Sequence, residues 1–237
     1  FLGFASDPAS TKTAVAYTLK RLRVDYIDIY RPARVSPMVP IEDTVGAIAD
    51  LVKAGYVRHI GLSEAGAETI RRAHKVHPIV DLQIEYSILT RGVEDKILPV
   101  LRELGIGLTA YGVLSRGLIS ESALGGGSIG GFRSHSPRFR GENLGKNLTL
   151  VQALKAIADE KGCSVAQLAI AWVASRGDDI VPLVGARKRE RLVDALGALD
   201  VTITPDDLAR IDAAAPVGAT AGARYAPEQM AMLDSEQ

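Results

Sequence analysis

The sequence predicts an α/β fold built on a parallel sheet, and three observations support this class. Short runs of β-branched and aromatic residues alternate with segments of helical periodicity along most of the chain. The repeating unit is a strand, a short loop and a helix, as in right-handed crossovers between parallel strands. The 237 residues are 47% hydrophobic, which provides a sizeable core. We therefore expect one domain over residues 1–237.

Five strands are expected, each at a short apolar run. They cover residues 26–30, 59–62, 80–85, 107–110 and 180–184. The last run has no polar residue and is bounded by Asp179 and Gly185, which predicts a strand buried on both faces. A closed barrel of eight β/α units takes about 250 residues. The chain therefore has nearly the length of such a barrel but only five of its strands.

The expected helices begin and end at recognisable signals. Ser10 or Thr11 is the candidate N-cap of the first helix, and Gly55 stops the second. The helices cover residues 9–22, 41–54, 67–74, 94–104, 150–161 and 165–175, with one more among the arginines after Gly185 and a last one from Thr204. Residues 125–145 are expected to form a loop, and the residues from Ala215 onward a surface tail.

Charge and cysteine content narrow the class of protein. The chain has 28 basic and 28 acidic residues, and a net charge of zero argues against a nucleic-acid binder with a broad basic surface. Cys163 is the only cysteine, so no internal disulfide can form and a reducing compartment is expected. No apolar run reaches the length of a membrane span. The composition thus indicates a soluble, cytoplasmic protein without nucleic-acid or membrane partners.

A basic corner follows the last predicted strand. Arg187, Lys188, Arg189 and Arg191 come directly after Gly185, and leucines then recur at helical spacing through Leu199. A helix N-terminus carries exposed N–H groups and the positive end of the dipole, so basic residues there are unfavourable unless an anion binds. The corner therefore indicates a phosphate site. A solvated basic helix face is the alternative.

Polar side chains also stand at the end of every predicted strand. Parallel barrels place their sites at these ends, so the residues together favour a ligand site. They are Arg31 and Arg34, Ser63 and Glu64, Gln83 and Glu85, Tyr111, and Arg187. The four histidines show no metal-ligand spacing with Cys163, and no metal is expected. Trp172 lies on an apolar helix face and is expected in the core.

Six motifs, in order, resemble the aldo-keto reductase family over nearly the whole chain, from about Ala9 to about Ala214. They are VDYIDIY at 24–30, GYVRHIGLS at 55–63, QIEYS at 83–87, AYGVLSRG at 110–117, PRFRGENL at 137–144 and VPLVGAR at 181–187. The resemblance implies a (β/α)₈ barrel, of which about five units are present here. It also implies a small-molecule carbonyl substrate, because the family reduces aldehydes or ketones to alcohols with NADPH.

The resemblance also assigns a cofactor site. Ser63 and Gln83 match the contacts to the nicotinamide carboxamide, and Tyr111 matches the aromatic residue that stacks on the nicotinamide ring. The loop along the pyrophosphate corresponds to Gly112, Val113, Leu114, Ser115, Arg116 and Gly117. At the basic corner, the matching residues are Gly185, Ala186, Arg187 and Arg191, and the two arginines fall where the family binds the adenosine 2′-phosphate. The planar fork of arginine suits a phosphate, which favours NADP over NAD.

The chain departs from the family pattern at several positions. Glu64 stands where the family usually has Asn, Ala195 where an Asn often meets the adenine, and Ala33 where it has the catalytic His. The family's catalytic Asp, Tyr and Lys belong to the first three strand units, which would precede Phe1. We therefore expect an NADP-dependent reductase whose catalytic residues lie upstream. The alternative is a non-catalytic, truncated barrel that binds nucleotide or a protein partner. Unpaired strand edges would favour self-association.

Overall fold

The computed structural model describes residues 6–127 and 130–237. Five strands form one sheet in the order β1 (Ile27–Tyr30), β2 (Val57–Ser63), β3 (Ile79–Glu85), β4 (Gly107–Tyr111) and β5 (Ile180–Pro182). The first three strands pair in parallel. This confirms the predicted α/β class with its parallel sheet.

The chain divides into two compact units, which we describe separately. Unit 1 consists of the described residues up to Ile84 together with residues 93–108 and 231–237. Unit 2 consists of residues 85–92 and the described part of 109–230. A single domain over residues 1–237 stays a prediction.

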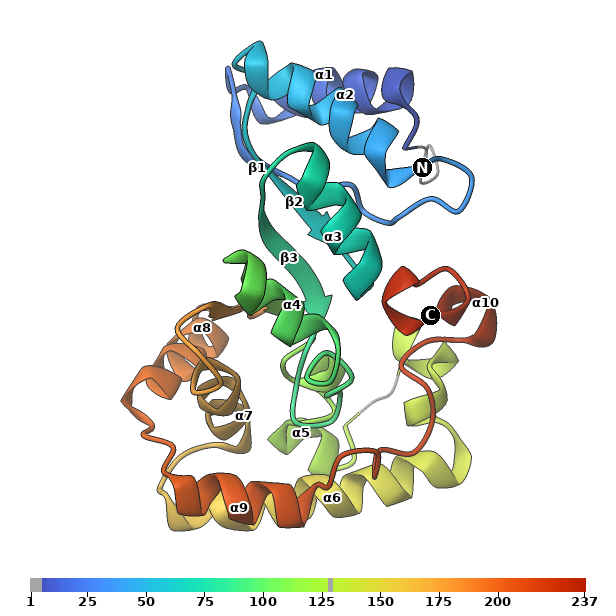
Figure 1. Cartoon of the computed structure of the whole chain (residues 1–237). Helices are drawn as coiled ribbons and strands as arrows, with labels where there is room; N and C mark the ends of the chain where they lie inside the picture. Colours follow the sequence, from blue (N-terminus) through green and yellow to red (C-terminus); the bar gives the residue numbers. More distant parts are fainter. Residues whose placement is uncertain (1–5, 128–129) are drawn as a thin grey trace. The chain divides into compact units, whose positions relative to one another are not determined.

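Unit 1 contains the four α-helices α1 (Pro8–Leu22), α2 (Ile41–Lys53), α3 (Ala67–Val76) and α4 (Ile97–Leu104). Helices α1 and α2 lie side by side, and α2 also packs on α3 and β2 (Figure 1). The prediction of Ser10 or Thr11 as the N-cap of α1 was wrong. Asp7 is the N-cap, and its Oδ1 accepts from the Ser10 N–H at 3.0 Å. Thr11 is instead buried, so its side chain serves packing.

Unit 2 is mainly helical. Its helices are η1 (Ser115–Gly117), α5 (Glu121–Leu124), η2 (Gly131–His135), η3 (Pro137–Phe139), α6 (Gly141–Glu160), α7 (Val165–Ala174), α8 (Arg189–Leu196), η4 (Gly197–Asp200), α9 (Pro205–Ala214) and α10 (Pro227–Met230). Helix α6 lies beside α9 and also packs on α7 (Figure 1). Trp172 on α7 is fully buried, as predicted, and its ring lies 5.4 Å from that of Tyr86.

Two predictions of local structure in unit 2 were wrong. The residues expected as a loop over 125–145 include η2, η3 and the first turn of α6, which begins nine residues before the predicted start at Leu150. The strand after Asp179 ends at Pro182 and is not buried on both faces, because the Val181 side chain is 62% exposed. The leucines of α8 are exposed too. Their apolar character therefore does not reflect burial in the structure described here.

The prediction of a surface tail after Ala215 was also wrong. Arg224 is buried in unit 2, and Leu233 is buried in unit 1, where it precedes the short helix η5 (Asp234–Glu236). The Ala221 N–H donates to Asn147 Oδ1 of α6 at 2.8 Å, and the Thr220 hydroxyl donates to the Leu89 carbonyl at 2.9 Å. The residues after Ala215 are therefore packed into the protein, those up to 230 in unit 2 and those of 231–237 in unit 1.

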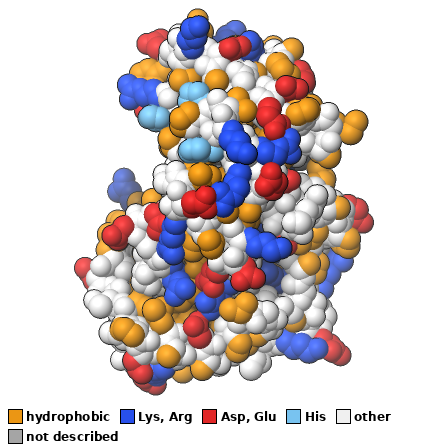
Figure 2. Space-filling view, viewed as in Figure 1, with side chains coloured by type: hydrophobic (Ala, Val, Ile, Leu, Met, Phe, Trp, Pro, Cys, Tyr) orange, Lys and Arg blue, Asp and Glu red, His pale blue; other side chains and the backbone are white. Residues whose placement is uncertain are grey.

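The distribution of surface charge and the character of the helices are relevant to binding of nucleic acids and membranes. On the face shown in Figure 2, Lys and Arg side chains are interspersed with Asp and Glu side chains. In the part of the chain that the structure describes, no helix has the length and apolar character needed to span a membrane.

The N-terminus of α9 should make stability depend on pH. Lys161 Nζ donates to the Asp207 carboxylate at 2.7 Å and the Thr204 N–H donates at 2.8 Å, and these bonds lower the pKa of Asp207 from 3.8 to about 2. The ionised carboxylate thus stabilises the fold above pH 3.8, and about 2 kcal/mol is lost as the pH falls through about 2. Urea unfolding from pH 7 to 2 should show the difference between wild type and Asp207→Asn shrinking by that amount. A difference independent of pH would contradict the assignment.

Candidate cofactor site

The carboxyl ends of β2 and β3 bring two of the predicted cofactor residues together in unit 1. Ser63, the last residue of β2, is the register partner of Gln83 on β3. The next residue, Glu64, adopts a left-handed backbone (φ 53°), and its N–H donates to the Gln83 carbonyl at 3.0 Å. Such a conformation is costly for a residue other than glycine and is often found at functional sites. Ser63 and Gln83 are thus held side by side at one strand end.

The C-terminal segment of unit 1 covers Glu64. The Ser235 hydroxyl donates to Glu64 Oε2 at 2.8 Å, and the Ser235 N–H donates to the Glu64 carbonyl at 3.1 Å. Asp234 Oδ2 accepts from the Gly66 N–H at 2.7 Å. Gly66 is the N-cap of α3, so Asp234, from a distant part of the chain, accepts from one of the backbone N–H groups at the start of this helix that have no partner within it. Glu64 is fully buried by these contacts.

An ion pair crosses β2 beside this strand end. Arg31, the residue after β1, donates from Nε to Asp81 Oδ2 on β3. A Cβ atom at Gly61 of β2 would lie 2.8 Å from Arg31 Cγ, so the arginine can cross only because this residue is glycine. Arg34, by contrast, donates to the carbonyl of its neighbour Ala33. Of the two arginines predicted at this end, Arg31 thus reaches across the sheet to β3.

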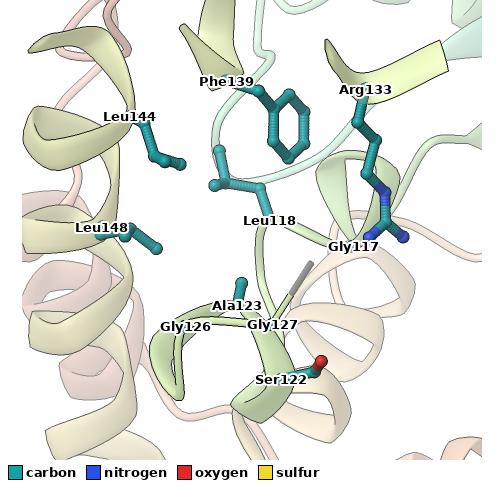
Figure 3. A pocket seen from close by; sticks show the side chains of 10 residues that line it. All are labelled: Gly117, Leu118, Ser122, Ala123, Gly126, Gly127, Arg133, Phe139, Leu144 and Leu148. Carbon is teal, nitrogen blue, oxygen red and sulfur yellow. The ribbon is translucent and has the colours of Figure 1, made fainter. Parts of the chain in front are cut away.

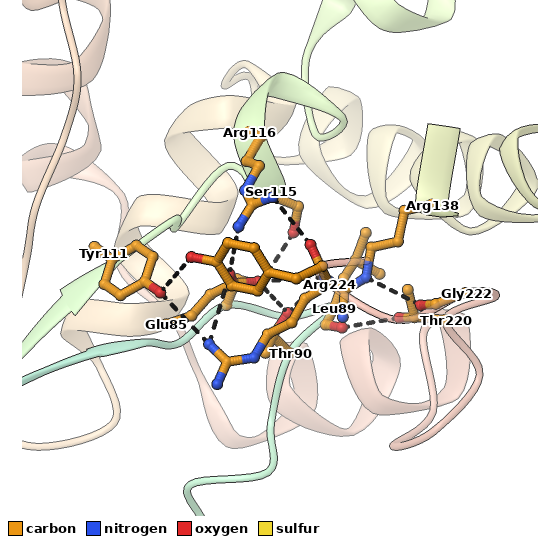
Figure 4. Close-up of polar contacts among 12 residues, drawn as sticks. Glu85, Leu89, Thr90, Tyr111, Ser115, Arg116, Arg138, Thr220, Gly222 and Arg224 are labelled. Carbon is orange, nitrogen blue, oxygen red and sulfur yellow. Dashed lines mark hydrogen bonds and ion pairs between the residues drawn. The ribbon is translucent and has the colours of Figure 1, made fainter. Parts of the chain in front are cut away.

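In unit 2, Glu85 at the end of β3 lies at the centre of a buried polar cluster (Figure 4). Its carboxylate is 2% exposed and lies 3.4 Å from Arg116, 3.4 Å from Arg138 and 3.8 Å from Arg224. The Thr90 hydroxyl donates to the same carboxylate at 3.0 Å. The buried Glu85 carboxylate therefore compensates the positive charges of three arginines in this unit.

The same cluster holds Tyr111, the predicted partner of the nicotinamide ring. The Tyr111 and Tyr225 hydroxyls share a hydrogen bond of 2.9 Å, and the Arg116 guanidinium stacks 4.1 Å from the centre of the Tyr225 ring. Arg116 in turn donates to the Arg224 carbonyl at 2.9 Å. The position of Tyr111 is therefore fixed at its backbone by β4 and at its hydroxyl by the C-terminal segment.

The predicted pyrophosphate loop turns sharply after Tyr111. Gly112 and Gly117 have positive φ values of 67° and 86°, and a Cβ atom at Gly112 would lie 3.0 Å from Glu85 Cγ. Both positions therefore require glycine. The side chains of Val113 and Ser115 are buried, and the Ser115 hydroxyl is 3.1 Å from that of Ser87. These two residues can offer a ligand only their backbone groups.

A pocket of about 190 Å³ lies in unit 2 beside Gly117 (Figure 3). Leu118, Phe139, Leu144 and Leu148 give it an apolar wall. Arg133 lies next to Gly117, where its Nη2 would be 2.5 Å from a Cβ atom placed on the glycine. The pocket thus combines an apolar wall with one guanidinium group at the predicted pyrophosphate loop.

The basic corner has the predicted order of strand, turn and helix. Helix α8 begins at Arg189, and its N-cap residue, Lys188, makes no side-chain capping bond. The predicted cofactor residues of this corner are all exposed, namely Gly185, Ala186, Arg187 and Arg191. Over residues 6–127 and 130–237, neither Arg187 nor Arg191 forms an ion pair with a carboxylate. The corner therefore presents open donors to solvent, which suits a phosphate and equally a solvated helix face.

Several residues of these clusters were not predicted from the sequence. Arg138 lies inside the motif at 137–144, so its position in the motif was a usable signal. No local sequence signal marked the other four, because their roles depend on contacts with residues distant in sequence. They are Asp81, Arg224, Tyr225 and Ser235.

Comparisons with known proteins identify the family. The sequence model of the aldo/keto reductase family matches residues 4–216. "Probable aldo-keto reductase 1" from Glycine max is 44% identical over 223 residues, which cover 92% of this chain and 63% of the relative. The chain thus spans less than two thirds of that relative's length.

Two solved structures are similar in fold. The glycerol dehydrogenase AKR11B4 from Gluconobacter oxydans matches with a TM-score of 0.83 and 26% identity, over 89% of this chain and 64% of that one. The thermostable aldo-keto reductase Tm1743, solved in complex with the inhibitor epalrestat, matches with a TM-score of 0.72 and 25% identity, over 88% of this chain and 67% of that one. The sequence and fold comparisons together show that the chain belongs to the aldo/keto reductase family.

Proposed function

We propose that the protein is an NADP-dependent oxidoreductase that reduces aldehydes or ketones to alcohols. The observation that carries the proposal is the family match over residues 4–216. The basic corner supports the choice of NADP, because Arg187 and Arg191 present guanidinium groups without a carboxylate partner among the described residues. A cytoplasmic location and self-association stay predictions.

In this proposal each part of the site has a separate task. Ser63 and Gln83 hold the nicotinamide carboxamide, and Tyr111 stacks on the ring, for which its hydrogen bond to Tyr225 already orients it. Gly112 and Gly117 let the backbone of the loop approach the pyrophosphate, and Arg187 and Arg191 bind the 2′-phosphate. When bound, NADPH supplies a hydride to the substrate. These residues therefore bind and orient the cofactor, and none of them is assigned the proton transfer.

The proposed reaction also needs a proton. Two electrons and a hydrogen pass to the carbonyl carbon, the carbon–oxygen π bond breaks, and the oxygen takes a proton from an acid to give the alcohol. We propose that an Asp, a Tyr and a Lys outside residues 1–237 supply this acid. The chain covers 63% of the Glycine max relative, which leaves room for them.

Turnover tests this proposal directly. The chain of residues 1–237 should oxidise NADPH at a negligible rate with a reactive aromatic aldehyde, and a form extended by the upstream residues should turn over. The measurement is the absorbance of NADPH at saturating cofactor. Robust turnover by residues 1–237 alone would rule out the placement of the acid. An extended form that binds NADPH without turnover would favour the non-catalytic alternative.

Cofactor preference gives a second test. Replacing Arg187 and Arg191 by Ala should weaken NADPH binding by about 1.5–3 kcal/mol per residue, because each loses a charge-assisted contact to the 2′-phosphate. NADH binding should change little. Nucleotide fluorescence titration measures both, and Arg189→Ala is the matched control from the same cluster. Equal losses for the two cofactors would refute the assignment and leave the solvated helix face as the explanation.

A further inference from the structure

The ion pair between Arg31 and Asp81 lies on the same sheet face as two predicted cofactor residues. Gly61 and Ser63 are two residues apart on β2, as are Asp81 and Gln83 on β3, so each pair projects to one face. The register joins Gly61 to Asp81 and Ser63 to Gln83. At about 3.3 Å per residue, the ion pair lies roughly 7 Å from the row of Ser63 and Gln83. Arg31 is thus a neighbour of the site in unit 1.

The guanidinium of Arg31 has donors to spare. Its Nε–H is bonded to Asp81, and within the described residues its Nη1 and Nη2 have no hydrogen-bond partner. Arginine has five N–H donors, so four remain for a ligand. The side chain is 25% exposed and that of Asp81 is 10% exposed. The donors are therefore held in a partly buried position but can be reached.

Charge decides what kind of group these donors suit. The Arg31–Asp81 pair has no net charge, so a ligand with a full negative charge would leave an uncompensated charge in a partly buried place. A neutral carbonyl meets no such cost. Its oxygen gains negative charge as hydride reaches the carbon, so fixed N–H donors stabilise the transition state more than the ground state.

We propose that Arg31 is a catalytic residue that binds the oxygen of the substrate carbonyl, with Asp81 as the positioning residue that holds its guanidinium. The inference rests on the proposed carbonyl reduction. Arginine stays protonated in proteins, so Arg31 donates hydrogen bonds and does not give up a proton. The proton that completes the alcohol comes from the separate acid described above.

The carbonyl stretch of a bound aldehyde reports this contact directly. The probe is benzaldehyde labelled at the carbonyl, added to the 237-residue chain with NADP⁺, which cannot deliver hydride and so leaves the aldehyde intact. Isotope-edited infrared spectroscopy should show a lowered stretching frequency in the wild type. In Arg31→Met the lowering should be lost, and the Kd of benzaldehyde should rise about ten- to a hundredfold. Arg31→Lys should keep part of both effects.

Two further variants separate this role from a structural ion pair. Gly61→Ala keeps both charges but places a methyl group 2.8 Å from Arg31 Cγ, so it should act like Arg31→Met. If Arg31→Met alone does not fold, Arg31→Met combined with Asp81→Leu removes the unpaired carboxylate and gives the same reading. Arg58→Met breaks an exposed pair with Asp28 and should leave the frequency unchanged.

The outcomes distinguish this inference from the proposed function. NADP⁺ binding is followed in parallel by protein fluorescence. If NADP⁺ binds but the frequency in Arg31→Met equals that of the wild type, or benzaldehyde does not bind at all, Arg31 does not contact the carbonyl and only this inference is overturned. If the wild type does not bind NADP⁺, the proposed function and the inference fail together.

Discussion

Replacing Glu85 by Ala should lower the free energy of unfolding by about 3–5 kcal/mol, which would be among the largest losses available in unit 2. The reason is that Arg116, Arg138 and Arg224 all face this buried carboxylate, and removing it leaves like charges close together in a place of low solvent access. Urea unfolding followed by circular dichroism measures the loss.

Two further variants test whether the loss of stability comes from the buried charge of Glu85. Glu85→Gln keeps the shape and the acceptor oxygen but removes the charge, so most of the loss should remain if electrostatics dominates. Glu142→Ala removes an exposed carboxylate that pairs with Lys146 on α6, and it should cost less than about 1 kcal/mol. A loss at Glu85 as small as that at Glu142 would show that the arginines are satisfied without the carboxylate.

Trp172→Ala should cost about 3–5 kcal/mol, because the indole is fully buried and its removal leaves a large cavity. The ring also packs on Tyr86, and the guanidinium groups of Arg91 and Arg176 lie 5.2 and 5.3 Å from its centre. The same unfolding experiment measures the effect.

The variant Trp172→Phe tests whether the loss of stability comes from the volume that the side chain fills. The indole Nε1 has no hydrogen-bond partner among the described residues, so phenylalanine sacrifices no hydrogen bond. It should therefore cost clearly less than alanine. Leu199→Ala, at a side chain that is 81% exposed, serves as the control with little effect. Equal losses for Phe and Ala would mean that something other than the filled volume matters at this position.

The sequence allowed the strands and most helices to be predicted because their signals are local. Residues 26–30 and 80–85 are rich in β-branched and apolar side chains, and β1 and β3 lie there within one residue at each end. The last helix was predicted from Thr204, and α9 begins one residue later with Thr204 as its N-cap, where it forms a capping box with Asp207.

The errors share a different cause. The first two turns of α6 contain Gly141 and Gly145, which are poor helix formers. Tertiary contacts hold these turns instead, such as the Asn147 side chain donating to the carbonyls of Arg138 and Ala221. Nothing near Arg224 in sequence indicates that it lies beside Glu85. For the site, the family motifs predicted the residues at the strand ends, but the C-terminal residues that hold them could be found only in the structure.

The contact of Asp234 with the start of α3 also has a consequence for synthesis of the protein. Gly66 and Asp234 are 168 positions apart, and Glu64 and Ser235 are 171 apart. At about 5–20 residues per second, a ribosome needs roughly 10–30 s to add the intervening residues, which include the whole of unit 2. During this interval the Gly66 N–H at the start of α3 lacks the Asp234 carboxylate, and Glu64 lacks its hydrogen bonds to Ser235. Unit 1, although it is translated first, is therefore the last to be completed.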